Sequence, residues 1–197
     1  MSLVDKAVDI LQAGGVIIFP TDTVWGIGAS LANPQAVKKL YQIKKRNRSQ
    51  PTAVLVGSIV QAKQLAELDK KSLSLLNQYW PGGLTVVVKA KEKTPSFIKG
   101  RKKGRATIGL RMPDHQLCLK ILKKLPLGLV AASANFAGQP APTKRKEIDP
   151  RLINQADLLL SGQSRGKLAS TVLDLTEKPF KALRKGPVVP EKLTLDK

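Results

Sequence analysis

Polar and cationic side chains follow the apolar runs of this sequence at points where strands would end. Hydroxyls and a carboxylate follow residues 16–19, and later runs end in arginine, hydroxyl or amide side chains. The set comprises Thr21, Asp22, Thr23, Arg111, Ser133, Asn135, Ser170, Thr171 and Arg184. In an open α/β sheet, ligands bind where strand ends and their loops converge. Bidentate arginine suits phosphate or carboxylate, so the set favours an anionic ligand, although each member alone is also typical of a turn or a helix cap.

A cluster of cations adds to this set. The stretch YQIKKRNRSQP, residues 41–51, places four cations in five positions at the end of a helix expected over 34–43. The apolar face of that helix continues onto Lys44, and an ammonium on a buried face is costly unless an anion meets it. Lys44 therefore indicates an anion site. The alternative is that the helix frays at Ile43 and the cations form a solvated cap on its C-terminal dipole.

The net charge of +20, from 34 basic and 14 acidic residues, indicates a polyanionic partner such as a nucleotide, RNA or both. Basic residues are densest in KGRKKGR (99–105) and TKRKE (143–147), both expected in loops. Aromatic residues are 4% of the chain, so RNA contacts would be mainly to phosphates. An RNA-binding protein, for double-stranded RNA, tRNA or rRNA, is thus an alternative function. Its candidate contacts are Arg101, Lys102, Lys103 and Arg105. A general abundance of lysine in the source organism's proteins would explain the charge equally well.

The elements that must position these residues read as an alternation of strands and helices. Strands are expected at 16–19, 53–56, 84–88, 106–112, 127–134, 157–160, 170–175 and 180–184, and helices at 4–11, 34–43, 59–66, 70–79 and 114–124. This alternation predicts an α/β fold with a mixed, twisted open sheet flanked by helices, and the last strands are close enough to pair antiparallel. We expect one domain over 1–189, with a basic concave pocket, and a short tail over 190–197.

Several chemistries are disfavoured. The chain has no G-x-x-x-x-G-K-[ST] phosphate loop, no G-x-G-x-x-G after the first strand and no G-x-S-x-G elbow. Its one cysteine, Cys118, and one histidine, His115, cannot form a Cys/His zinc site, and we expect a core position for the first and a helix-start position for the second. No apolar run would cross a bilayer, and Asp5 and Asp9 argue against a signal peptide. We therefore expect a cytoplasmic location.

The motifs occur in a recognisable order. GGVIIFPTDTVWGIGAS is followed by a helix ending in Lys44-x-Arg46, then GLRMPDH, Ser133-x-Asn135, STVLDL and LRKGPV. From about residue 5 to residue 189 this order resembles the YrdC/TsaC family of threonylcarbamoyl-AMP synthases, of which the pair K-x-R…S-x-N is the hallmark. The resemblance implies a YrdC-like fold and a nucleotidyltransferase reaction. In it, L-threonine, bicarbonate and ATP give threonylcarbamoyl-AMP and pyrophosphate, for the threonylcarbamoyladenosine modification of tRNA.

The resemblance also implies roles for residues. Lys44 and Arg46 would be catalytic, and the ATP-binding residues would be Lys44, Arg46, Ser133, Asn135 and Arg184. Thr21, Arg111 and Ser170 would hold threonine, with Arg111 on its carboxylate. Mg²⁺ would come with ATP and have few protein ligands, and a downstream tRNA threonylcarbamoyl transferase would take the product. A carbamate oxygen is already anionic, so its attack on the α-phosphorus needs alignment and charge neutralisation rather than a strong base.

Three positions depart from the family pattern. Trp25 stands where Tyr is usual, Asn47 replaces a common proline, and PTAVLV (51–56) lacks a histidine that some members place near threonine. ATP use is therefore better supported than strict preference for threonine. A similar domain occurs in hydrogenase-maturation carbamoyltransferases, but 197 residues leave no room for their accessory regions.

Overall fold

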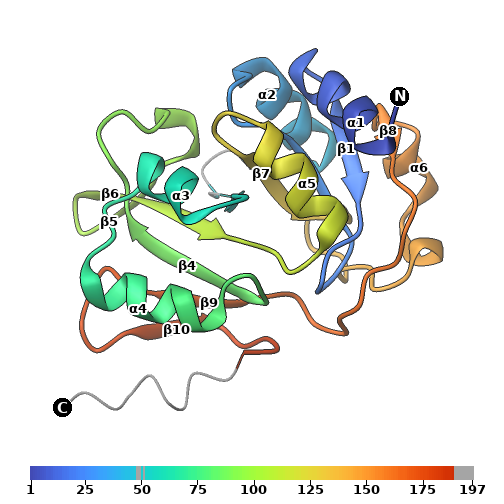
Figure 1. The fold of residues 1–197 in the computed structure, drawn as a ribbon. Coiled ribbons are helices and arrows are strands. Elements are labelled where there is room, and N and C mark those ends of the chain that lie inside the picture. Colours follow the sequence, from blue (N-terminus) through green and yellow to red (C-terminus); the bar gives the residue numbers. More distant parts are fainter. Residues whose placement is uncertain (48–49, 51, 189–197) are drawn as a thin grey trace.

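Ten strands form one mixed sheet in the part of the chain that the computed structural model describes, residues 1–47, 50 and 52–188. The strands are β1 (Val16–Phe19), β2 (Gly26–Ser30), β3 (Val54–Leu55), β4 (Leu84–Lys89), β5 (Gly100–Lys102), β6 (Arg105–Arg111), β7 (Leu129–Ser133), β8 (Leu158–Leu159), β9 (Thr171–Asp174) and β10 (Lys181–Arg184). Their order is β10-β9-β4-β6-β3-β7-β2-β1-β8, with β5 paired to β6 (Figure 1). The predicted tail, 190–197, lies outside the described residues.

The sheet is mixed, as predicted. The pairs β1/β8, β3/β6 and β4/β9 are parallel, and the remaining pairs are antiparallel, including the last two strands, β9 and β10. Strand β3 lies between β6 and β7, so β6 is an inner strand of the sheet. In the register, Arg111 pairs with Leu55 of β3, which pairs with Leu129 at the start of β7, so Arg111 and Ser133 lie toward opposite ends of the two strands that flank β3.

Helices cover the two faces unequally. They are α1 (Leu3–Gln12), α2 (Pro34–Ile43), α3 (Ile59–Leu65), α4 (Lys70–Tyr79), α5 (Gln116–Lys124) and α6 (Pro150–Ile153), with short 3₁₀ turns at Ser96–Ile98 and Arg145–Glu147. Apolar residues of α2, α3, α4 and α6 share one core with alternate strand residues such as Ile18 and Val86. A smaller core joins α1 and α5 to Ile17, Phe19 and Ala131 on the opposite face. The smaller core includes no residue of β4, β6 or β9, so among the described residues no helix covers that part of the face, and it can hold a ligand.

Two strands were not predicted. The first contains Gly26 and Gly28, residues that permit tight turns but here lie in β2, where a Cβ on Gly28 would come 2.8 Å from the Val130 carbonyl oxygen. Glycine therefore serves close strand packing here. The second, β5, lies in the basic stretch that was expected to be a loop. Lys103 and Gly104 both have positive φ, 46° and 76°, and form the two-residue turn of the hairpin that joins β5 to β6.

The lone cysteine and histidine take the structural positions that we expected. Cys118 is buried in the smaller core, and burial raises the pKa of its thiol to about 12. His115 is the N-cap residue of α5. Neither residue lines the cavity described below.

The end of α2 explains the spacing between Lys44 and Arg46. Lys44 is the C-cap, and the next residue, Lys45, has the left-handed conformation with φ 50°. The Lys45 N–H donates to the Gln42 carbonyl at 3.0 Å and the Arg46 N–H to the Tyr41 carbonyl at 3.0 Å, the two bonds of a Schellman motif. The turn directs the chain so that Lys44 is buried, and the alternative of a frayed, solvated Lys44 is wrong.

A prediction about stability follows from Lys45. Left-handed backbone costs an L-residue with a side chain about 1 kcal/mol relative to glycine. We expect Lys45→Gly to unfold at higher urea than Lys45→Ala, by about 1 kcal/mol in the free energy of unfolding. The comparison is matched, since both variants lose the same cation–π contact, 5.5 Å from the Lys45 ammonium to the Phe136 ring. Equal stability would contradict this account of the helix end.

Candidate active site

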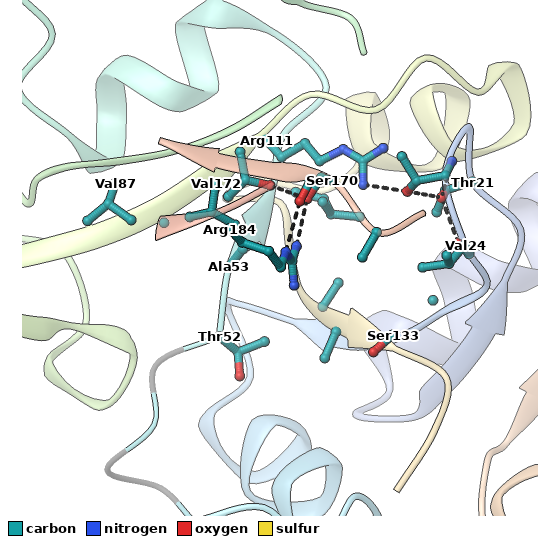
Figure 2. A pocket seen from close by; sticks show the side chains of 18 of the residues that line it. Thr21, Val24, Thr52, Ala53, Val87, Arg111, Ser133, Ser170, Val172 and Arg184 are labelled. Atoms are coloured by element: carbon teal, nitrogen blue, oxygen red, sulfur yellow. Dashed lines mark hydrogen bonds between the residues drawn. The ribbon is translucent and has the colours of Figure 1, made fainter. Parts of the chain in front are cut away.

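A cavity of about 410 Å³ lies on the uncovered face of the sheet (Figure 2). The described residues that line it include three arginines and no carboxylate. Six of the eight residues predicted to bind substrates line it, namely Thr21, Arg46, Arg111, Ser133, Ser170 and Arg184. Along the strand that forms its floor, successive side chains point alternately to the cavity and to the core. Thr85 and Val87 of β4 face the cavity, and Val86 between them faces the larger core. The strands that carry these residues therefore all contribute to one cavity.

Arg184 and Ser170 act as one unit. The Arg184 Nε donates to the Ser170 carbonyl at 2.9 Å, and its Nη2 donates to the Ser170 hydroxyl at 3.0 Å. That hydroxyl also bonds to the Thr85 hydroxyl at 2.7 Å. Burial, and then the neighbouring charges of Arg111 and Arg46, lower the pKa of the Arg184 guanidinium. Three guanidinium groups thus act on one space, and a polyanion would relieve their mutual repulsion.

Arg111 is held by three bonds. Its Nε donates to the Gly82 carbonyl at 3.0 Å, Nη1 to the Thr23 hydroxyl at 2.8 Å and Nη2 to the Asp22 carboxylate at 2.6 Å. Figure 2 shows this guanidinium directed toward the turn that carries Thr21. A guanidinium has five N–H groups. These bonds therefore leave one N–H on each terminal nitrogen of Arg111 for a ligand.

Lys44 is buried, with 3% of its surface exposed, but it is not among the described residues that line the cavity. Its ammonium donates to the carbonyl oxygens of Ser133 at 2.5 Å and Asn135 at 2.6 Å, and its own carbonyl accepts from the Ala137 N–H at 3.1 Å. Burial, and then the Arg46 charge, lower its pKa to about 8. The inward orientation is confirmed. The partners in this structure are carbonyl dipoles rather than the anion that we expected.

Asn135 also lies outside the described lining of the cavity. Its side-chain amide donates to the carbonyls of Phe136 at 2.9 Å and Gln139 at 2.7 Å. Its Oδ1 is buried and has no hydrogen-bond partner in the described part of the chain. Asn135 and Lys44 together shape the turn after β7. Contact of either with ATP stays a prediction.

Comparison with known proteins agrees with this geometry. The family model for Sua5, YciO and YrdC, described as telomere recombination, matches residues 9–186. The chain belongs to this family. The resemblance seen in the sequence is therefore confirmed, and its motifs account for six of the lining residues.

Relatives within the family carry informative names. A threonylcarbamoyl-AMP synthase of Pyrococcus abyssi is 34% identical over 182 residues, 91% of this chain and 53% of the relative. One of Bacillus subtilis is 34% identical over 191 residues, 95% of this chain and 54% of the relative. The structure of Pyrococcus abyssi Sua5 complexed with L-threonine superposes with a TM-score of 0.88 at 32% identity, covering 96% of this chain and 56% of that one. The chain thus spans about half the length of these relatives.

Relative to the family motifs, sequence reasoning missed several hydroxyls of the cavity. Thr52, Thr85 and Thr107 all line it, and none was singled out from the sequence, whereas Thr23 was named among the strand-end residues without a specific role. The available signal was alternation, since Thr85 and Thr107 are the hydroxyl positions within apolar strands. Asp22 was noted as a strand-end residue, but its ion pair with Arg111 was not foreseen.

The basic hairpin adjoins the cavity through Gly100 of β5, but its four cationic side chains are not among the described residues that line the cavity. Lys102 forms ion pairs with Asp174 at 2.5 Å and Glu177 at 3.4 Å, and Lys103 pairs with Glu177 at 2.7 Å. Arg101 and Arg105 are exposed. Two of the four residues predicted to contact RNA are thus already paired with carboxylates. RNA contact at this surface stays a prediction.

Neither a metal-binding cluster nor a membrane-spanning helix is found among the described residues. Within the described ranges, no group of three or more His, Cys, Asp and Glu residues is placed to hold a metal ion. Nor does any helix in those ranges combine the length and apolar character needed to cross a membrane.

Proposed function

We propose that this chain is an L-threonylcarbamoyladenylate synthase, a nucleotidyltransferase that uses L-threonine, bicarbonate and ATP. The observation that carries the proposal is the convergence of Arg46, Arg111 and Arg184 with hydroxyl donors on one cavity, in a family whose relatives bear this name. The same comparisons favour this activity over RNA binding as the main function.

The proposed chemistry divides the cavity into two ends. Arg46, Arg184 and Ser133 would receive the triphosphate, since fixed guanidinium groups neutralise charge that increases as pyrophosphate leaves. Arg111, Thr21 and Ser170 would receive the amino acid, with its carboxylate on Arg111. Ser170, which is also bonded to Arg184, would lie where the two ends meet. Lys44 would add a positive charge behind the turn that carries Ser133.

The proposed reaction has two steps, and each step forms one bond and breaks another. The threonine nitrogen adds to the carbon of bicarbonate, and loss of water leaves a carbamate. A carbamate oxygen then attacks the α-phosphorus as the bond from that phosphorus to the bridging oxygen of pyrophosphate breaks. The nucleophile is already anionic, so the site is required to align and neutralise the reactants. No step needs His115 or Cys118.

Mg²⁺ fits this proposal as the counterion of ATP. The described lining of the cavity has no carboxylate, so this chain would hold the ion through the phosphates of the nucleotide. A cytoplasmic location, and a tRNA threonylcarbamoyl transferase that consumes the adenylate, follow from the proposed product.

The test is pyrophosphate release from ATP and bicarbonate with L-threonine, with L-serine, and with no amino acid. We expect release that depends on the amino acid and on bicarbonate. Release with threonine should exceed release with serine, because a β-methyl group in an apolar pocket contributes roughly tenfold. Arg46→Ala should reduce it, and Arg101→Ala, a change in the exposed hairpin, should not. No release under any condition would overturn the proposal.

A further inference from the structure

The turn that holds Arg111 is itself tightly bonded. The Thr21 hydroxyl donates to the Val24 carbonyl at 2.7 Å and accepts from the Thr23 N–H at 3.0 Å. The hydroxyls of Thr21 and Thr23 are 3.0 Å apart, and the Thr23 hydroxyl in turn accepts from Arg111. Figure 2 shows this chain of bonds running from Arg111 past Thr21 to Val24. The position of the guanidinium therefore depends on the conformation of residues 21–23.

A second segment crosses this turn from outside. We call residues 161–169, which join β8 to β9, the strap; they form the orange segment between those strands in Figure 1. The Ser164 hydroxyl accepts from the Thr21 N–H at 3.2 Å. The Arg165 N–H donates to the Thr21 carbonyl at 3.2 Å, and the Gly166 N–H donates to the Thr23 carbonyl at 2.9 Å. Three bonds from three consecutive strap residues thus fix both ends of the turn.

Gly166 is needed for this contact. A Cβ at position 166 would lie 2.6 Å from the Thr23 Cα and 2.7 Å from the Thr23 carbonyl oxygen. Both are backbone atoms, so they could not move aside without moving the turn. Any larger residue at this position would push the strap and the turn apart.

Asp22 gives the arrangement a chemical selectivity. Its carboxylate, 2.6 Å from Arg111 Nη2, cancels much of the arginine's charge, whereas Arg184 is bonded to the neutral Ser170. Asp22 repels any anion near Arg111, but it repels a multiply charged phosphate more strongly than a singly charged carboxylate, which can accept from the N–H groups that remain on Nη1 and Nη2. The Arg111 end of the cavity is therefore suited to an amino-acid carboxylate and the Arg184 end to phosphate.

We propose that Ser164 and Gly166 of the strap are positioning residues for the amino-acid subsite. They fix the turn at residues 21–23, and Asp22 and Thr23 of that turn fix the Arg111 guanidinium that receives the carboxylate. The identity of the carboxylate ligand rests on the proposed function. The mechanical link from strap to Arg111 does not, and it can be tested in the protein without any ligand.

The first test uses NMR of arginine side chains in the ligand-free protein. A guanidinium held on three sides rotates slowly about its C–N bonds, so Arg111 should give separate Nη proton signals. Gly166→Ala and Ser164→Ala should broaden or merge them, and Asp22→Asn should do so most. Gln163→Ala, an exposed change on the same strap, is the matched control and should leave them unchanged. Signals unaffected by the Gly166 and Ser164 changes would overturn the proposal.

The second test measures substrate affinity. Ser164→Ala should raise the KM and the calorimetric Kd for L-threonine roughly tenfold, the effect of displacing one charged hydrogen bond, and should leave the KM for ATP nearly constant. Thermal unfolding reports any general loss of structure. Equal changes in both KM values would mean a merely structural role and would also overturn the proposal. If the wild type bound no threonine at all, the proposed function would fail, while the NMR result would stand.

Discussion

Replacing Arg111 by lysine is expected to reduce the threonine kcat/KM of pyrophosphate release by roughly 10²–10³-fold. Lysine keeps the charge but loses the planar fork, so it cannot meet Gly82, Thr23 and Asp22 together and still offer two parallel N–H groups. At least two charge-assisted hydrogen bonds, of about 1.5–3 kcal/mol each, would be lost. The measurement is the rate as a function of threonine concentration at saturating ATP.

A matched control separates this effect from general damage. Arg101→Lys makes the same change on the exposed hairpin and should leave the rate unchanged. Arg111→Met should also lower the free energy of unfolding, by about 3–5 kcal/mol, because it leaves the nearly buried Asp22 carboxylate without its cation. A rate for Arg111→Lys within threefold of the wild type would refute the role of Arg111 in the amino-acid subsite.

The sequence was a good guide to which residues converge. Arg111, Ser133 and Arg184 each end a strand, Thr21 follows β1 by two residues and Ser170 directly precedes β9. This local property can be predicted from apolar runs and turn residues. That they share one cavity depends on the strand order. The parallel pairs β3/β6 and β4/β9 join strands distant in the chain, and no local pattern specifies them.

Partners were harder to predict than positions. The helical period showed correctly that Lys44 faces inward, since it continues the apolar face of α2. Its partners, the carbonyls of Ser133 and Asn135, lie 89 and 91 residues away. Similarly, Asp22 is separated from Arg111 by 89 residues. Contacts of this kind are set by the packing of the whole sheet.

Strand β2 shows a different limit of sequence reasoning. Its sequence, GIGAS, has two glycines that are typical of a turn, yet it pairs with β1 and β7 within the sheet. Propensity was overridden by packing, because the neighbouring carbonyl of Val130 leaves no room for a side chain at Gly28. The hairpin at 99–105 was not predicted, because a run of charged residues is more typical of a loop than of a strand.

Replacing Lys44 by methionine is expected to weaken ATP binding and to destabilise the turn after β7. Methionine fills a similar volume but leaves the Ser133 and Asn135 carbonyls without their donor, at about 1–3 kcal/mol for each buried group. Methionine also avoids the cost of keeping a buried ammonium away from water, and this offsets part of the loss. We therefore expect the free energy of unfolding to fall by about 1–3 kcal/mol. Urea unfolding measures it. Lys120→Met, on the surface helix α5, serves as a control for removal of a lysine charge.

The pH dependence of the wild type provides a sharper test of Lys44. Its pKa of about 8 lies below the usual value for lysine, about 10.4 in an unfolded chain. Between these values the unfolded chain binds more protons than the folded one, so the free energy of unfolding should rise with pH through this window. ATP affinity should change in the opposite direction, because deprotonation removes a positive charge beside the proposed phosphate subsite. In Lys44→Met both trends should disappear. An ATP Kd for the wild type that parallels that of Lys44→Met from about pH 7 to pH 9.5 would show that the Lys44 charge does not act on the nucleotide.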